Sequence, residues 1–148
     1  MKVLANDGIS QSGIDALQPK GFEVITTNVA QEQLISYINE NKITVLLVRS
    51  ATTARKDLVD SCPSLKIIGR GGVGMDNIDV DYAREKGLKV INTPASSSAS
   101  VAELVFAHLY GGVRFLHDSN RNMPLEGESN FKGLKKAYAK GIELRGKT

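Results

Sequence analysis

The sequence has a single cysteine, Cys62, in 148 residues. It therefore cannot form an internal disulfide or a zinc site built from cysteines. A lone thiol without a nearby base is typical of a small buried hydrophobe rather than of a nucleophile. Long apolar runs are lacking as well, because none approaches the roughly 18 residues of a membrane-spanning helix. The first residues lead at once into Asn6 and Asp7, which leaves no signal-peptide core and predicts a cytoplasmic protein without a membrane partner.

The composition is that of an ordinary globular chain. Hydrophobic residues make up 41% and charged residues 24% of the sequence, and a chain of this length is about one domain long and can bury its own core.

Positive charge is concentrated towards the end of the chain. From residue 114 onward there are eight Lys or Arg against four Asp or Glu, whereas the net charge of the whole chain is +3. Beyond Phe115, only Phe131 and Tyr138 are aromatic in this stretch, and no nucleic-acid-binding motif is present. We therefore expect a solvated face or a local attraction for a small anion, and no nucleic-acid partner.

Short β-rich runs alternate with helical patterns in the first two thirds of the chain. The expected strands are 2–5, 22–26, 44–49, 65–69 and 88–92, and the expected helices are 12–17, 31–41, 55–61 and 80–86. Strands that alternate with helices predict an α/β fold with a parallel, doubly wound sheet. A compact unit of five such strands favours the flavodoxin-like order 2-1-3-4-5.

The last third of the chain has a different pattern. Ser100 and Glu103 form a capping box for a helix expected from about 101 to 116, whose apolar residues exceed a single stripe. Such a helix should be buried on more than one side. The stretch 120–148 is rich in Gly, Asn and Lys, and we expect an extended arm rather than a compact element there.

Gly69, Gly71 and Gly74 spell G-x-G-x-x-G after an apolar run. A dinucleotide loop of this pattern needs a helix that starts at the loop and an acidic residue at the end of the next strand. Here the helical pattern resumes only at Val80, after two aspartates, and the next strand ends in Asn92 without an acid. The glycines are better interpreted as a loop at the carboxyl edge of the sheet that exposes backbone N–H groups to a small anion.

Several motifs together resemble one enzyme family. Residues 48–52 read VRSAT, 68–79 read IGRGGVGMDNID, 90–94 read VINTP and 100–103 read SVAE. In this order and spacing they resemble the D-isomer-specific 2-hydroxyacid dehydrogenases, most closely the branch that acts on 3-phosphoglycerate. The resemblance covers nearly the whole chain.

The resemblance implies two domains, one that binds the substrate and one that binds NAD. Residues 1–95 would form a flavodoxin-like substrate domain, and 96–148 an interdomain helix and dimerisation arm at the start of an NAD-binding domain. That domain's own glycine loop would follow a segment similar to residues 143–148, so the sequence is expected to be the amino-terminal part of an enzyme and inactive alone. The implied reaction is hydride transfer between NAD and C2 of 3-phosphoglycerate, which gives 3-phosphohydroxypyruvate for L-serine synthesis.

Site residues follow from the resemblance in part. Arg49 and Ser50, at the carboxyl end of the third strand, are expected to hold the acidic end of the substrate, since an arginine binds carboxylate or phosphate bidentately; the alternative for Arg49 is a surface ion pair. Gly72, Val73 and Gly74 would offer N–H groups to the substrate carboxylate, with Val73 also on the nicotinamide side. Ser97 would contact substrate, or else belong to a flexible hinge.

No catalytic residue is expected in this chain. The family uses an arginine and a histidine tuned by a glutamate, and all three would lie beyond it. His108 and His117 fall on the expected long helix, where a packing or surface role is typical. No metal site is expected.

Subunit contacts are also implied. In the family this helix and arm pack against a second subunit, so we expect a homodimer through residues 100–148. Lys135 and Lys136 of one subunit are then expected to reach the phosphate held near Arg49 of the other.

Two alternative functions from other protein classes fit the sequence poorly. A response-regulator receiver shares the strand order but needs acidic residues where Arg49 and Ser50 stand. A flavodoxin-like FMN site would want a better phosphate loop than residues 6–10. A stand-alone module that binds a small anion, and a dehydrogenase for another D-2-hydroxy acid, stay open.

Overall fold

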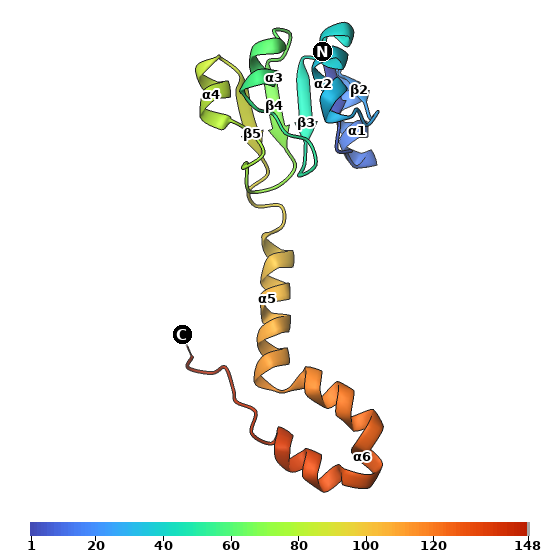
Figure 1. The fold of residues 1–148 in the computed structure, drawn as a ribbon, viewed down its shortest axis with the longest axis vertical. Helices are drawn as coiled ribbons and strands as arrows, with labels where there is room; N and C mark the ends of the chain where they lie inside the picture. Colours follow the sequence, from blue (N-terminus) through green and yellow to red (C-terminus); the bar gives the residue numbers. More distant parts are fainter. Residues whose placement is uncertain (148) are drawn as a thin grey trace. The chain divides into compact units, whose positions relative to one another are not determined.

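The computed structural model describes residues 1–147. It divides into two compact units, Met1–Ser97 and a second unit that starts at Ser98, and Figure 1 shows the elements of each. None of the described helices has both the length and the apolar character that crossing a membrane would need.

The first unit is built on a five-stranded sheet. The strands are β1 (Lys2–Ala5), β2 (Glu23–Ile25), β3 (Val45–Val48), β4 (Ile67–Arg70) and β5 (Lys89–Asn92). Neighbours pair in parallel in the order β2-β1-β3-β4-β5. The predicted α/β class and strand order are therefore confirmed, with strand ends that differ by only one or two residues from those expected.

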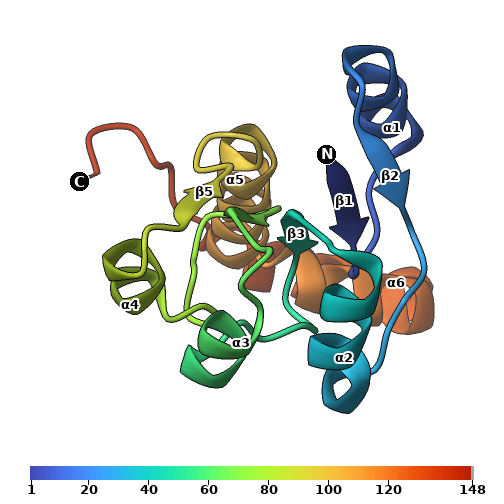
Figure 2. The ribbon, with the colours of Figure 1, turned by 90° about the horizontal axis from the view of Figure 1, so that it is seen from above.

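Helices cover the two faces of this sheet unequally. They are α1 (Gln11–Leu17), α2 (Gln31–Asn41), α3 (Lys56–Ser61) and α4 (Val80–Glu85), and a short 3-10 turn, η1 (Gln18–Lys20), follows α1. Figure 2 shows α2, α3 and α4 on one side of the sheet and α1 on the other. This arrangement follows from right-handed crossovers between parallel strands on either side of β1.

The core lies between the sheet and the three helices on one side. Leu34 and Ile38 of α2 and Leu58 of α3 are fully buried, as are Leu46 and Ile68 of the central strands. Helix α1 buries no residue. The opposite face of the sheet is consequently more open, and Ile91 of β5 is 45% exposed there.

The second unit consists of two helices, α5 (Ser98–Val113) and α6 (Leu116–Tyr138). The predicted helix 101–116 therefore begins earlier and ends earlier than expected. Phe115 adopts a left-handed backbone conformation with φ 54°, which is uncommon for residues other than glycine. This conformation interrupts the helical path and separates α5 from α6. The Phe115 ring lies 6.2 Å from that of Tyr138, so the break lets the two ends of α6 pack together.

The expected extended arm over 120–148 is wrong for most of its length, because α6 occupies it as far as Tyr138. Good helix formers such as Leu, Glu and Lys outweigh the Gly and Asn residues that suggested an arm. The helix tolerates Pro124 and a non-helical residue, Asn130, where it kinks. Leu134 is buried, and Asn122 Nδ2 donates to Tyr138 Oη at 2.9 Å. This hydrogen bond joins the first half of α6 to its last residue.

Helix α5 is not buried on more than one side in this chain, contrary to expectation. It has no buried residue. Its large apolar residues are 41–58% exposed, namely Val101, Leu104, Val105, Phe106, Leu109 and Tyr110. Within the second unit, helix α6 leaves this apolar surface uncovered.

Candidate functional site

The predicted anion-binding segments follow the carboxyl ends of adjacent strands. Val48, Arg70 and Asn92 lie side by side in the register of β3, β4 and β5. Arg49 therefore follows its strand beside the start of the glycine loop. The glycine loop in turn starts beside the segment that follows Asn92. Ligands of open parallel sheets bind at this edge, because the connections between strands diverge there.

The glycine loop after β4 is fastened to the end of β5. Asn92 Nδ2 donates to the Val73 carbonyl at 2.7 Å, and the Thr93 N–H donates to the Gly72 carbonyl at 3.1 Å. The Gly72 N–H is itself used in a bond to the Arg70 carbonyl. Among the described residues, the N–H groups of Val73 and Gly74 have no hydrogen-bond acceptor. Two of the three predicted backbone donors are therefore available to an anion.

The glycines have reasons other than a pyrophosphate. A Cβ on Gly69 would lie 2.8 Å from Leu47 Cδ2, and one on Gly72 would lie 2.6 Å from an Arg70 guanidinium nitrogen. Helix α4 starts only at Val80 and is six residues long. The N-terminus of α4 therefore does not lie at the loop, and a side chain at Gly69 or Gly72 would have to displace the end of the Leu47 or Arg70 side chain.

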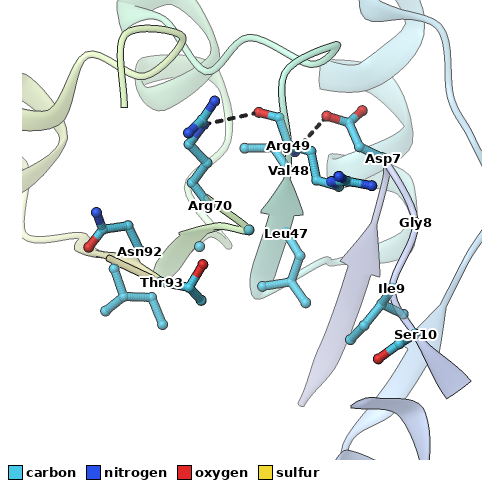
Figure 3. Close-up of a pocket in the computed structure, with 13 residues that line it drawn as sticks. Asp7, Gly8, Ile9, Ser10, Leu47, Val48, Arg49, Arg70, Asn92 and Thr93 are labelled. Atoms are coloured by element: carbon cyan, nitrogen blue, oxygen red, sulfur yellow. Dashed lines mark hydrogen bonds between the residues drawn. The ribbon is translucent and has the colours of Figure 1, made fainter. Parts of the chain in front are cut away.

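The segment after β3 is held at both sides of its backbone. The Arg49 N–H donates to Asp7 Oδ2 at 2.6 Å, and the Arg49 carbonyl accepts from Asn77 Nδ2 at 2.8 Å and from Arg70 Nε at 3.4 Å. Figure 3 shows Asp7 and Arg70 on opposite sides of Arg49. The residue is exposed, so its side chain is free of the contacts that fix its backbone.

Asp7 is a site residue that the sequence reasoning missed. Its carboxylate accepts from the Thr52 N–H at 3.1 Å and from the Thr52 hydroxyl, in addition to Arg49. Partial burial opposes ionisation, but the bonds from Thr52, Arg49 and the Ala51 backbone outweigh it and hold the pKa of the carboxyl below its usual 3.8. The available signal was the pair of polar residues that directly follows the first apolar strand.

A hollow of about 760 Å³ opens beside these segments. It is lined by residues at or just after the ends of β1, β3, β4 and β5, including Asp7, Arg49, Arg70 and Thr93 (Figure 3), and by Leu47 and Ile91. Of the predicted site residues only Arg49 lines it. Ser50, Val73 and Gly74 lie outside it on the same edge.

The remaining predicted residues are exposed. Ser97 is the last residue of the first unit and is exposed, and so are Lys135 and Lys136 on α6. His108 lies on α5 but His117 lies on α6, so the two histidines do not share one helix as expected. Their roles in binding stay predictions.

Two other features carry no chemistry. Cys62 is buried, and burial together with the Asp57 charge raises the pKa of its thiol to about 11, so the group stays protonated at neutral pH. Within residues 1–147, no group of three or more His, Cys, Asp or Glu side chains could hold a metal ion.

Comparison with known proteins decides the family. Residues 3–140 match the family model described as D-isomer specific 2-hydroxyacid dehydrogenase, catalytic domain. The chain belongs to this family.

Members of the D-isomer specific 2-hydroxyacid dehydrogenases with curated names resemble the chain throughout. A D-3-phosphoglycerate dehydrogenase of Methanocaldococcus jannaschii is 38% identical over 148 residues, which is 100% of this chain and 27% of that protein. A hydroxypyruvate reductase of Thermotoga maritima is also 38% identical, over 99% of this chain and 46% of that protein. The chain thus spans between about a quarter and a half of the length of these relatives.

Solved structures of other proteins have the same fold. An NAD-bound 3-phosphoglycerate dehydrogenase of Entamoeba histolytica is 26% identical with a TM-score of 0.63, over 77% of this chain and 39% of that one. A protein of Pyrococcus horikoshii has a TM-score of 0.79 at 19% identity, over 97% of this chain and 42% of that one. At that identity the second match shows the fold alone.

Proposed function

We propose that this chain is the amino-terminal, substrate-binding part of an NAD-dependent D-3-phosphoglycerate dehydrogenase. The whole enzyme oxidises 3-phosphoglycerate to 3-phosphohydroxypyruvate in L-serine biosynthesis, in the cytoplasm. This chain supplies the groups that grip the acidic substrate, and it is inactive without the remainder of the enzyme.

The observation that carries the proposal is a cluster of anion-binding groups at one sheet edge. Arg49 presents an exposed guanidinium beside the glycine loop, where Val73 and Gly74 have free backbone N–H groups. A substrate with a carboxylate and a phosphate needs two such positions, one that donates backbone N–H bonds and one that carries positive charge. Relatives named D-3-phosphoglycerate dehydrogenase support this choice of substrate.

NAD enters the proposal from the family rather than from this chain. Solved relatives are described with bound NAD. In the proposal the cofactor is bound mainly by a domain outside this sequence, and Val73, which is 51% exposed, borders the nicotinamide. When bound, NAD accepts the hydride from C2. The residues of this chain orient the substrate for that transfer and take no part in moving the proton.

The test is a pair of titrations of the purified 148-residue chain. NADH, followed by nicotinamide fluorescence, should show no binding. 3-Phosphoglycerate, followed by amide chemical shifts, should move the signals of Val73 and Gly74, and Arg49→Gln should weaken this binding about tenfold, as expected for loss of a charged hydrogen bond. NADH binding at micromolar levels would overturn the assignment of the glycine loop to substrate.

A second subunit completes the site in this proposal. Homodimerisation through α5 and α6 would cover the exposed apolar residues of α5. Lys135 and Lys136 of one subunit would then reach the phosphate held near Arg49 of the other.

Changing Lys135 and Lys136 together to Ala in the full-length enzyme should raise the KM for 3-phosphoglycerate several-fold, because a phosphate contact is lost. The affinity for NAD should not change. Lys132→Ala and Lys140→Ala, on the same basic stretch, are the controls. A KM equal to that of the unchanged enzyme would remove these lysines from the site.

Another D-2-hydroxy acid is the second candidate substrate, because a relative of equal identity is named hydroxypyruvate reductase. The ratio of kcat/KM for 3-phosphohydroxypyruvate and hydroxypyruvate in the full-length enzyme separates the two. A preference for the unphosphorylated acid would favour the second candidate.

A further inference from the structure

Two backbone N–H groups of the segment after β3, those of Arg49 and Thr52, donate to one internal anion. Asp7 Oδ2 accepts both the Arg49 N–H at 2.6 Å and the Thr52 N–H at 3.1 Å. Its other oxygen accepts the Thr52 hydroxyl. Successive N–H groups that converge on one point form an anion-binding concavity. Here the concavity is already filled by a side chain of the same molecule, from the end of β1 (Figure 3).

A buried chain of hydrogen bonds fixes the direction of these donors. Asn6 Oδ1 accepts the Val29 N–H at 2.8 Å, and Asn6 Nδ2 donates to the Val29 carbonyl at 3.0 Å and to Thr52 Oγ1 at 2.8 Å. Because Thr52 Oγ1 already accepts from Asn6, its own proton points to Asp7. Asn6 is 3% and Thr52 is 3% exposed, so water does not compete for these bonds.

The carbonyl side of the same segment is held from the next connection. Asn77 is 6% exposed, and its Nδ2 donates to the Arg49 carbonyl at 2.8 Å and to the Thr52 carbonyl at 2.6 Å. The segment is thus clamped between Asp7 on its N–H side and Asn77 on its carbonyl side. The side chains of Arg49 and Ser50, which are both exposed, and the Ser50 N–H are left for a ligand.

We propose that Asp7 is a positioning residue that occupies the N–H concavity of residues 49–52 as a built-in anion and thereby aims Arg49 and Ser50 at the substrate. This inference rests on the proposed function. It has a specific consequence: the Arg49 and Thr52 N–H groups are withheld from the substrate, so its acidic end at this position is held mainly by the side chains of Arg49 and Ser50.

An alternative role for Asp7 as a direct ligand of the substrate does not fit its contacts. A carboxylate repels an anion, and both its oxygens are already engaged with Arg49 and Thr52. Its charge is balanced locally by these donors, which allows a second anion to bind a short distance away at the Arg49 guanidinium.

The experiment compares the 148-residue chain with Asp7→Asn and Asp7→Ala by amide chemical shifts. An N–H bound to a carboxylate resonates downfield, so the Arg49 and Thr52 amides should move upfield in both variants. Titration with 3-phosphoglycerate should give about tenfold weaker binding for Asp7→Asn, because an amide cannot accept from all three donors. Asp15→Asn on α1, whose carboxylate binds only Gln11 in the structure, is the control and should bind like the unchanged chain.

Added formate gives a sharper test with Asp7→Ala. Formate is a carboxylate small enough to enter the vacated concavity, and it should return the Arg49 and Thr52 amide shifts and strengthen 3-phosphoglycerate binding. If formate merely competed for the substrate position, it would weaken binding instead, in Asp7→Ala as in the unchanged chain. That opposite sign would count against the proposal.

The outcomes separate this inference from the proposed function. Wild-type binding of 3-phosphoglycerate by a folded Asp7→Asn chain would overturn the role of Asp7. If no form of the chain binds 3-phosphoglycerate, the proposal that this sheet edge binds the substrate is wrong. The clamp on residues 49–52 is then tested only by the Arg49 and Thr52 amide chemical shifts. Unmoved Arg49 and Thr52 amides in Asp7→Asn would then overturn the clamp too, whereas an upfield shift would support it.

Discussion

At the residue scale, the site depends on polar side chains that point inward from strand ends. Asn6, Thr52 and Asn77 are the buried polar residues of the described chain, and all three hold the segment that carries Arg49. Burying a polar side chain is costly unless it forms hydrogen bonds. Because these three residues lie at one edge of the sheet, the hydrogen bonds that they form hold the backbone of the loop that carries Arg49 in one conformation.

Asn77→Ala tests this at one residue. The change removes a part-buried bond to the Arg49 carbonyl and a buried bond to the Thr52 carbonyl, so it should lower the free energy of unfolding by about 2 kcal/mol. Asn39→Ala is the matched control. Asn39 Nδ2 likewise donates to a backbone carbonyl, that of Ser61, but this hydrogen bond is exposed to solvent. The effect of Asn39→Ala should stay below about 1 kcal/mol in urea denaturation. Equal losses would show that burial of the Asn77 bonds does not matter.

At the element scale, α5 differs from the three helices that cover the core face of the sheet in the first unit. Helices α2, α3 and α4 each bury at least one residue against the sheet, whereas α5 buries none. Packing of an apolar face usually supplies most of a helix's stability in a protein. Helix α5 therefore depends more than the others on its intrinsic propensity or on a partner chain.

Gly111→Ala and Gly112→Ala distinguish these two sources. A Cβ at either position would meet nothing within 4 Å in this chain. Alanine should therefore raise helix content in circular dichroism and stabilise the helix by roughly 0.5–1 kcal/mol per change. Ala107→Gly should act in the opposite direction. A loss of stability on adding the methyl groups would mean that another chain packs tightly against these glycines.

At the scale of the whole molecule, the exposed apolar surface of α5 calls for a second subunit. Sedimentation equilibrium should find the 148-residue chain as a dimer. Val101→Glu with Leu104→Glu should shift it to monomer, since each residue is more than half exposed here and burial of such a side chain contributes about 1.5–3 kcal/mol. Ile91→Glu, an exposed apolar position in the first unit, is the control and should leave the dimer intact. A monomer at all concentrations would contradict the proposed assembly.

The sequence by itself determined the first unit. Alternation of apolar strands with helical patterns was sufficient for the α/β class with a parallel sheet, because parallel strands need crossover connections. The order β2-β1-β3-β4-β5 could not be read from the pattern and was expected only because compact five-stranded units of this kind commonly adopt it. The late start of α4 at Val80 was visible as well, and with it the absence of a helix N-terminus at the glycine loop. Arg49 could be placed at a strand end because it directly follows the run Val45–Val48.

Only the tertiary structure decided what surrounds these residues. The fold brings Asp7 within hydrogen-bond distance of Arg49, 42 positions along the chain, and no local pattern reports a contact between the ends of β1 and β3. The break at Phe115 was missed for a related reason, because its ring packs near the distant ring of Tyr138, whereas sequence patterns reflect local propensity. Residue types and their periods thus fix the elements, and contacts between distant strand ends fix the site.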